Sequence, residues 1–321
     1  TLVRDGRQIR IFAWVTTLTL AFLAYNFNDI YLQSNVYLWQ RGWGGVDNNG
    51  VAMVMVMAVP PLFFMGIHTR QWWLKPVCLL GVLLAAHVPL FTYSRGGQLG
   101  LCMIGVVIFI FSLIKLPNKI ITIIAALIAV MVTFNLAGEL VRERFMSIFV
   151  EKSERDESAQ SRFSTWRAGW QCLKDNPLGV GPRNFNLISH QYGLPYNKSV
   201  HNLFLQTGAD YGWPGLFGLC LFYFGSVWKC WRMMRTKWAR RLHWPVYYAT
   251  MVIVSMAGFL LCSTFIGMES VELGFILCMI GLCSVAHVDR IAVREQSESM
   301  NAIPELEEVV SPSGQPALAP A

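Results

Sequence analysis

Long apolar stretches separated by short polar links make up most of the chain. Several of these stretches reach the 18 or so residues that a helix needs to cross a hydrocarbon core of about 30 Å. In lipid, backbone groups must form hydrogen bonds within their own segment, so such stretches are helical. We interpret about eight of them as membrane spans, at approximately 9–27, 50–67, 76–93, 97–115, 119–137, 200–228, 245–266 and 271–288. The pattern predicts an all-α, polytopic transmembrane helical bundle.

A long polar segment divides the predicted spans into two groups. The organisation is an N-terminal group of about five spans, a long loop, a C-terminal group of about three spans and a tail, at 1–137, 138–199, 200–288 and 289–321. The loop is predicted to be partly helical, with an amphipathic interfacial helix at 139–150 and a mobile stretch at 151–161. The polar, proline-containing tail is predicted to be disordered and cytoplasmic.

A second helix is predicted in the loop from Ser161 to Asp175, and Asn176-Pro177 ends it. Its apolar residues are spaced three and four apart, on one helical face: Phe163, Trp166, Trp170 and Leu173.

Positive charge is concentrated in the links between apolar stretches. Link 229–244 contains several Lys and Arg residues and no acid, which predicts a cytoplasmic position. Alternation then places the N-terminus, link 68–75 and the tail inside, and places 28–49, the turn at Tyr93–Gly97 and the loop 138–199 outside. The net charge of +7 therefore signals topology at lipid headgroups, and we predict no nucleic-acid partner.

The cysteines do not form a metal or disulfide pattern. The chain has eight, scattered mostly inside apolar stretches, with no CxxC pair and no Cys/His ligand spacing. We predict no metal and no cofactor, and most of these thiols are expected to be packing residues.

The turn Ser94-Arg95-Gly96-Gly97 is the first candidate for chemistry, because it places a guanidinium at the membrane boundary. The five donors of Arg95 suit phosphate or carboxylate oxygens, and the glycines are expected to let the backbone approach a ligand closely. The alternative is that Arg95 only reaches toward headgroups and the glycines only turn the chain.

The segment that begins at His201 is the second candidate. His201 lies at the outer mouth of the predicted span 200–228, and histidine exchanges a proton near neutral pH. Asn202 or Asp210 is expected to orient the imidazole, and Asp210 would lie about two and a half turns deeper if the helix is regular. The alternative is an interfacial histidine beside a polar helix cap.

Arg162, Trp166, Arg167 and Trp170 form the third candidate, because arginines and aromatic rings alternate near a membrane surface. Such a surface suits an anionic head group, with the rings resting on lipid or sugar. The alternative is an ordinary amphipathic helix.

Taken together, four stretches resemble the O-antigen ligase (Wzy-C, WaaL-like) superfamily, close to its O-glycosylation ligases. In chain order they are DNNGVAMVMVMAVPPL at 47–62, TYSRGGQLG at 92–100, SRFSTWRAGWQCLKDNPLGVGPRNF at 161–185 and HNLFLQTGADYGWPGL at 201–216. The usual acidic residue of the last motif appears here as Asp210. The chain has fewer spans than is usual in the family, and we expect the shortfall at the N-terminus.

The resemblance implies a GT-C-like, metal-independent transferase that moves a glycan from undecaprenyl diphosphate to an acceptor, a lipid A–core or a protein hydroxyl. It implies a multi-pass protein of the bacterial inner membrane whose active site faces the periplasm. His201 would activate the acceptor hydroxyl, and Arg95 and Arg162 would hold the diphosphate. We assign Arg167, Trp166, Asn202 and Asp210, with Arg162, to substrate binding.

Elementary chemistry agrees with this assignment. A diphosphate leaving group needs fixed positive charge, and no outer cluster of carboxylates is available to hold Mg²⁺. His190, in the loop, is the reserve choice for the base.

Two other functions remain open. An O-antigen polymerase would use the same donor with a lipid-linked acceptor. A transporter or flippase would need broken helices and ionisable groups within the membrane. Pro60-Pro61 is expected to break the second span, and His87 is a possible proton relay. A noncatalytic scaffold is disfavoured by the arginine and histidine positions.

Overall fold

The computed structural model describes residues 3, 5–34, 37–115, 157–266 and 272–309, with isolated positions between 119 and 131. Within these residues the regular elements are helices, and the only β pairing is an isolated bridge between Trp43 and Val46. In chain order the elements are α1 (Gly6–Gln33), α2 (Tyr37–Arg41), α3 (Asn48–His68), α4 (Leu74–Phe91), α5 (Arg95–Lys115), α8 (Glu157–Asp175), α9 (Asn184–Ile188), η2 (Ser189–Tyr192), α10 (Leu203–Met233), α11 (Lys237–Leu242), α12 (Trp244–Ser263) and α13 (Leu273–Val309). The predicted all-α class is confirmed.

Six helices of the described part are long and apolar enough to cross a membrane: α1, α3, α4, α5, α12 and α13. Each coincides with a predicted span. Of the two remaining predictions, 119–137 lies almost entirely outside the described residues, and 200–228 falls on α10, which is not among the six. The protein is therefore a multi-pass membrane protein, and six of the expected spans are found.

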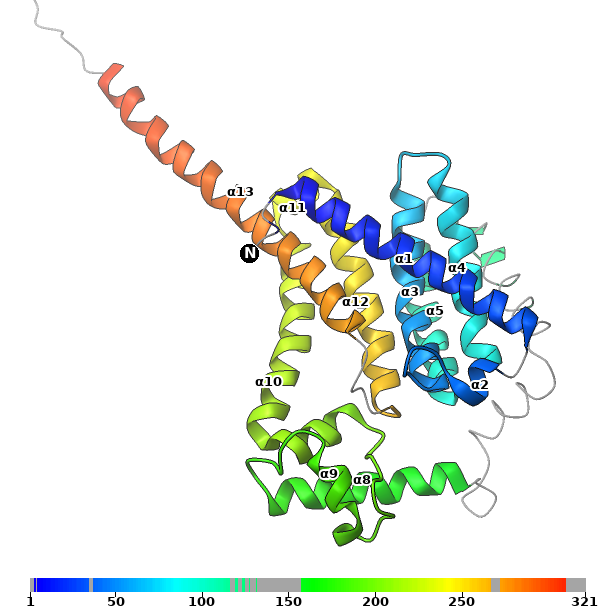
Figure 1. Cartoon of the computed structure of the whole chain (residues 1–321). Coiled ribbons are helices and arrows are strands. Elements are labelled where there is room, and N and C mark those ends of the chain that lie inside the picture. The colour runs from blue at the N-terminus through cyan, green and yellow to red at the C-terminus, as the bar shows by residue number, and fades with distance from the viewer. Residues whose placement is uncertain are drawn as a thin grey trace, which may run out of the picture.

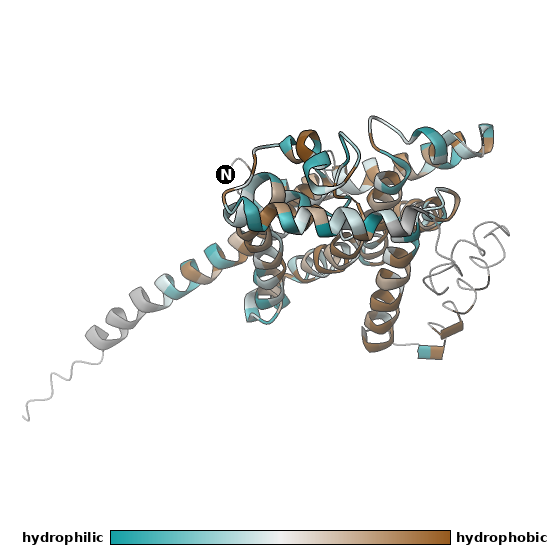
Figure 2. Cartoon of the chain, turned by 90° about the horizontal axis from the view of Figure 1, so that it is seen from below, coloured by the Kyte–Doolittle hydropathy of each residue, from teal (hydrophilic) through white to brown (hydrophobic). Residues whose placement is uncertain are grey.

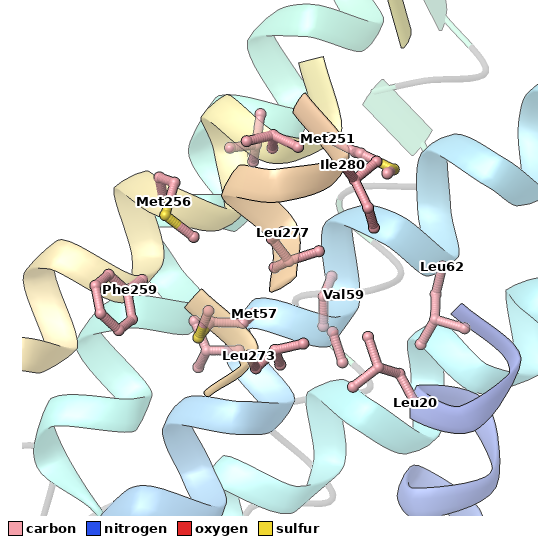
Figure 3. Close-up of a cluster of buried hydrophobic side chains, with 14 of the residues drawn as sticks. Leu20, Met57, Val59, Leu62, Met251, Met256, Phe259, Leu273, Leu277 and Ile280 are labelled. Carbon is pink, nitrogen blue, oxygen red and sulfur yellow. The ribbon is translucent and has the colours of Figure 1, made fainter. Parts of the chain in front are cut away.

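Helix α3 forms the centre of the bundle. It is apolar on all sides and most of its residues are buried, as expected of a helix surrounded by other helices. Figure 3 shows Met57 and Val59 of α3 packed among side chains of α12 and α13. The Ser255 hydroxyl of α12 donates to the Met57 carbonyl at 3.0 Å. Helix α3 runs unbroken through Pro60 and Pro61, so the expected break in this span is wrong.

The predicted span 200–228 is not one regular helix. Helix α10 is kinked at Gly212, whose φ of 68° and ψ of −166° are not helical. Pro214 has no N–H to donate to the Asp210 carbonyl, and the Trp213 N–H donates instead to the Pro177 carbonyl at 2.9 Å. The kink thus frees two carbonyls and separates the first part of α10 from the part that runs along α12.

The loop that follows α8 satisfies these carbonyls. The Val180 N–H donates to the Ala209 carbonyl at 3.0 Å, and the Gly181 N–H donates to the Asp210 carbonyl at 2.8 Å. A Cβ at Gly179 would lie 2.4 Å from the Asp210 carbonyl oxygen, so only glycine fits there. Asp210 is consequently held against this loop, in the layer formed by α8, α9 and the start of α10 in the lower part of Figure 1.

Helix α8 begins at Glu157, earlier than predicted, and ends at Asp175 as predicted. Its buried face includes Ala168, Cys172 and Leu173, whereas Phe163 and Trp170 are exposed by 53% and 44%. The expected apolar face is therefore only partly correct. In Figure 2 this layer lies nearest the viewer and is largely teal and white, while the bundle helices are mainly brown. The predicted interfacial helix at 139–150 lies outside the described residues.

Helix α13 continues to Val309, so residues 289–309 are helical rather than disordered as expected. Residues 310–321 lie outside the described part.

The two ends of the bundle differ in chemistry. At one end α3 finishes and α12 begins, and the rings of His68 and Tyr247 stack there with centroids 4.4 Å apart. Links 68–75 and 229–244 lie at this end. At the other end α3 begins and α12 finishes. The 92–95 turn between α4 and α5 also lies there, bonded to the start of α3 through Asn48. The links predicted to be cytoplasmic thus share one end, and the candidate site residues lie at the opposite end.

Candidate functional site

The turn that carries Arg95 is fixed to the beginning of α3. The buried Ser94 hydroxyl accepts from the Gly97 N–H at 3.2 Å, which caps α5, and donates to Asn49 Oδ1 at 2.8 Å. The Asn48 side chain donates to the Thr92 carbonyl at 2.8 Å. Arg95 is the first residue of α5 and is half-buried, so a rigid turn presents its guanidinium at the helix end.

The glycines of this turn serve packing. A Cβ at Gly97 would lie 2.6 Å from Ala52 Cβ of α3, and one at Gly96 would lie 3.3 Å from Phe265 Cβ. Side chains of α3 and of the residues after α12 therefore occupy the space that we expected a ligand to approach.

His201 lies immediately before the first turn of α10, with a left-handed φ of 53°. Such a conformation is uncommon for a residue other than glycine or asparagine and persists only where neighbours enforce it. The carbonyl of Val200 accepts from the Thr165 hydroxyl of α8 at 2.9 Å. The side chain of Asn202 accepts from the Leu205 N–H at 3.0 Å and donates to the Thr264 carbonyl at 3.1 Å. Both neighbours of His201 are therefore fixed.

The end of α12 connects the two candidates. Thr264 binds Asn202, and Phe265 packs on Gly96 beside Arg95. The Phe265 ring also meets Trp166 of α8, with centroids 5.9 Å apart. The Arg95 turn and His201 thus flank the same two residues, which directly follow α12, at the end of the bundle opposite the basic links.

Charges around His201 affect its protonation. Burial lowers the pKa of the imidazole below its ordinary value of 6.5, and the positive charges of Lys198 and Arg162 lower it further. The carboxylate of Asp47, at the N-cap of α3, raises the pKa and opposes these effects. The neutral imidazole, which can accept a proton, is therefore favoured at neutral pH.

The residues of α8 take different positions. Arg162 and Trp166 are half-buried and lie on the side of His201 and Phe265. Arg167 is exposed, and Trp170 meets Trp213 edge to face at 5.8 Å. The geometry brings Arg162 and Trp166 to the site, and substrate binding by Arg167 stays a prediction.

The polar residues of α10 hold the backbone around His201. The Gln206 side chain accepts from the Val200 N–H at 2.9 Å and donates to Asp210 at 2.8 Å. Asp210 also accepts from the Phe185 N–H at 3.1 Å. These bonds favour a positioning role for Asn202 and Asp210. Asn202 caps α10 directly after His201, and Asp210 acts through Gln206 on Val200, directly before His201. Their direct contact with substrate stays a prediction.

Sequence reasoning missed Asp47 and Lys198 as the charges around His201. A signal for Asp47 was its place before the Asn-Asn-Gly at the start of a span, which is typical of a helix N-cap. No local signal pairs Lys198 with the imidazole. Among the described residues, no three His, Cys, Asp or Glu side chains are grouped so as to hold a metal ion.

Comparison with known proteins finds a family match. The model of the O-antigen ligase family matches residues 80–220, a range that contains Arg95, Arg162 and His201. No curated protein matches the chain at a significant level. Both the match and the helical membrane architecture agree with the resemblance of the four sequence stretches. Residues 80–220 of the chain are similar to the O-antigen ligase family, which suggests a membrane glycan enzyme of the ligase or polymerase type.

Proposed function

We propose that the protein is a glycan ligase of the bacterial inner membrane. It transfers a glycan from undecaprenyl diphosphate to a hydroxyl group of an acceptor, a lipid A–core or a protein, at the periplasmic face. The observation that carries this proposal is the position of the Arg95 turn and His201 on either side of Thr264 and Phe265. A base and a fixed cation beside one another are what transfer from a lipid diphosphate needs.

In this mechanism the neutral imidazole of His201 takes the proton from the acceptor hydroxyl as its oxygen attacks the anomeric carbon of the glycan. The bond between that carbon and the diphosphate oxygen breaks, and undecaprenyl diphosphate leaves with the electron pair. Arg95 and Arg162 hold the negative charge that develops on the leaving group. Trp166 and Arg167 support the donor, and the reaction needs no metal ion.

A reconstituted transfer assay tests the proposal. We expect the purified protein in liposomes to move one glycan from the lipid donor to each acceptor, at the same rate with and without EDTA. A ladder of longer lipid-linked glycans would identify a polymerase instead. If EDTA stopped turnover and Mg²⁺ or Mn²⁺ restored it, the metal-free mechanism would be wrong. Movement of intact donor across the liposome without transfer would indicate a flippase.

The pH dependence of transfer reports the charges around His201. Since the base must be neutral, the rate should fall on the acid side with a midpoint below 6.5. Lys198→Met removes a positive charge, raises the pKa of His201 and should move the acid limb to higher pH. Asp47→Asn removes a negative charge and should move it to lower pH, while the amide still caps α3. Initial rates between about pH 5 and 8 measure both shifts, and shifts in the same direction would contradict the assignment.

A further inference from the structure

Three buried side-chain atoms in the described part of the chain have no hydrogen-bond partner: Gln98 Oε1, Gln98 Nε2 and Trp166 Nε1. Gln98 is only 3% exposed, so its amide is shielded from bulk solvent. Buried polar groups without partners are rare and costly in a folded protein, and each needs an explanation. A ligand that binds there would supply the missing bonds.

Both residues adjoin the turn that carries Arg95. Gln98 is one helical turn beyond Ser94 in α5, and its N–H donates to the Ser94 carbonyl at 2.9 Å. Because helical side chains lean toward the N-terminus, the Gln98 side chain is expected to cover the turn that begins with Ser94 and Arg95. Trp166 approaches from α8, through its ring contact with Phe265 on Gly96. Both residues thus belong to segments that adjoin the turn carrying Arg95, the proposed diphosphate site.

The chemistry of these atoms restricts the ligand. Gln98 Nε2 needs an acceptor, but Gln98 Oε1 needs a donor, which the ionised oxygens of a diphosphate cannot provide. A sugar hydroxyl or an acetamido group both donates and accepts. The indole N–H of Trp166 needs only an acceptor. The three atoms without partners, one acceptor and two donors, therefore match a sugar better than a phosphate.

We propose that Gln98 binds the sugar attached to the diphosphate of the donor. A hydroxyl or acetamido group of that sugar donates to Oε1 and accepts from Nε2, and a neighbouring sugar oxygen accepts from Trp166 Nε1. This inference rests on the proposed function and adds a sugar-recognition residue to it. Arg95 binds the diphosphate. Gln98, one helical turn further along α5, recognises the sugar attached to it.

The Gln98→Met variant, which keeps the shape and removes both polar atoms, separates this role from a structural one. Its melting temperature without ligand should equal or exceed that of the wild type, because no bond within the protein is lost. Gln206 is the matched control, since it is 5% exposed and is bonded to Val200 and Asp210. Gln206→Met should therefore lower the melting temperature. A comparable fall in Gln98→Met would overturn the proposal.

Binding provides the second readout. The probes are undecaprenyl diphosphate and the same lipid carrying one N-acetylglucosamine, with affinities measured in detergent or nanodiscs. The wild type should bind the sugar-bearing lipid more tightly, and Gln98→Met should reduce that preference about tenfold while binding the bare lipid diphosphate unchanged. Trp166→Phe should weaken the preference, whereas Arg95→Ala should weaken binding of both lipids.

The inference and the proposed function fail in different ways. If the wild type shows no preference for the sugar-bearing lipid, or if Gln98→Met keeps the full preference, the role of Gln98 is wrong even where transfer proceeds. If the preference behaves as expected but no acceptor receives glycan, sugar recognition by Gln98 stands and the ligase proposal fails.

Discussion

Replacing His201 by Asn is expected to slow glycan transfer about 100- to 10,000-fold, the contribution typical of a general base. An amide does not take up a proton near neutral pH, so the acceptor hydroxyl would attack without assistance. Asparagine tolerates the left-handed backbone at φ 53°, and the bonds that hold Val200 and Asn202 remain. The fold and the abundance in the membrane should therefore be unchanged, while His201→Ala should lose activity similarly.

The rate is measured in liposomes that contain donor and acceptor, with melting temperature as the control for folding. His190→Asn provides the matched comparison, since His190 is exposed in the loop beside Tyr196. That variant should keep nearly the full rate. Loss of transfer in His190→Asn together with an active His201→Asn would move the base to the loop.

Arg95→Lys is expected to reduce transfer about 100- to 1000-fold, the range found when a group that stabilises transition-state charge is removed. Lysine keeps the charge but presents a single ammonium, which cannot replace the planar fork of donors on a diphosphate. The turn itself should persist, because Ser94, Asn49 and Asn48 hold it without the Arg95 side chain.

Arg95→Ala should lose at least as much activity as Arg95→Lys. Arg70→Lys, in the basic link at the other end of the bundle, should have no effect on the rate. Full activity of Arg95→Lys would show that only net charge matters at this position and would contradict a bidentate contact.

Much of the bundle could be predicted from the sequence, because a span is a local property of its own residues. The apolar stretches at 50–67 and 245–266 become α3 and α12 within a few residues. The kink in α10 was harder to predict. The conformation at Gly212 depends on loop residues more than 30 positions earlier, through the bond between Trp213 and Pro177.

In the candidate site, too, the features set by local sequence could be predicted, and those set by distant segments could not. Arg95, Arg162 and His201 were found through motifs, and the Asn202 cap follows from its place at the start of a helix. The charges of Asp47 and Lys198, and the unsatisfied amide of Gln98, become visible only when distant segments are placed together. A buried glutamine without partners has no signature in a sequence.

A crosslink between positions 95 and 201 tests most directly whether the cation and the base share one outer site. The measurement uses Arg95→Cys with His201→Cys, in a chain whose eight native cysteines are replaced, and a membrane-impermeant bis-maleimide added outside sealed right-side-out vesicles. An intramolecular crosslink is predicted for this pair, and none for Arg95→Cys with Arg240→Cys. Reaction of either position 95 or position 201 only from the cytosolic side, or no crosslink between them, would contradict the account.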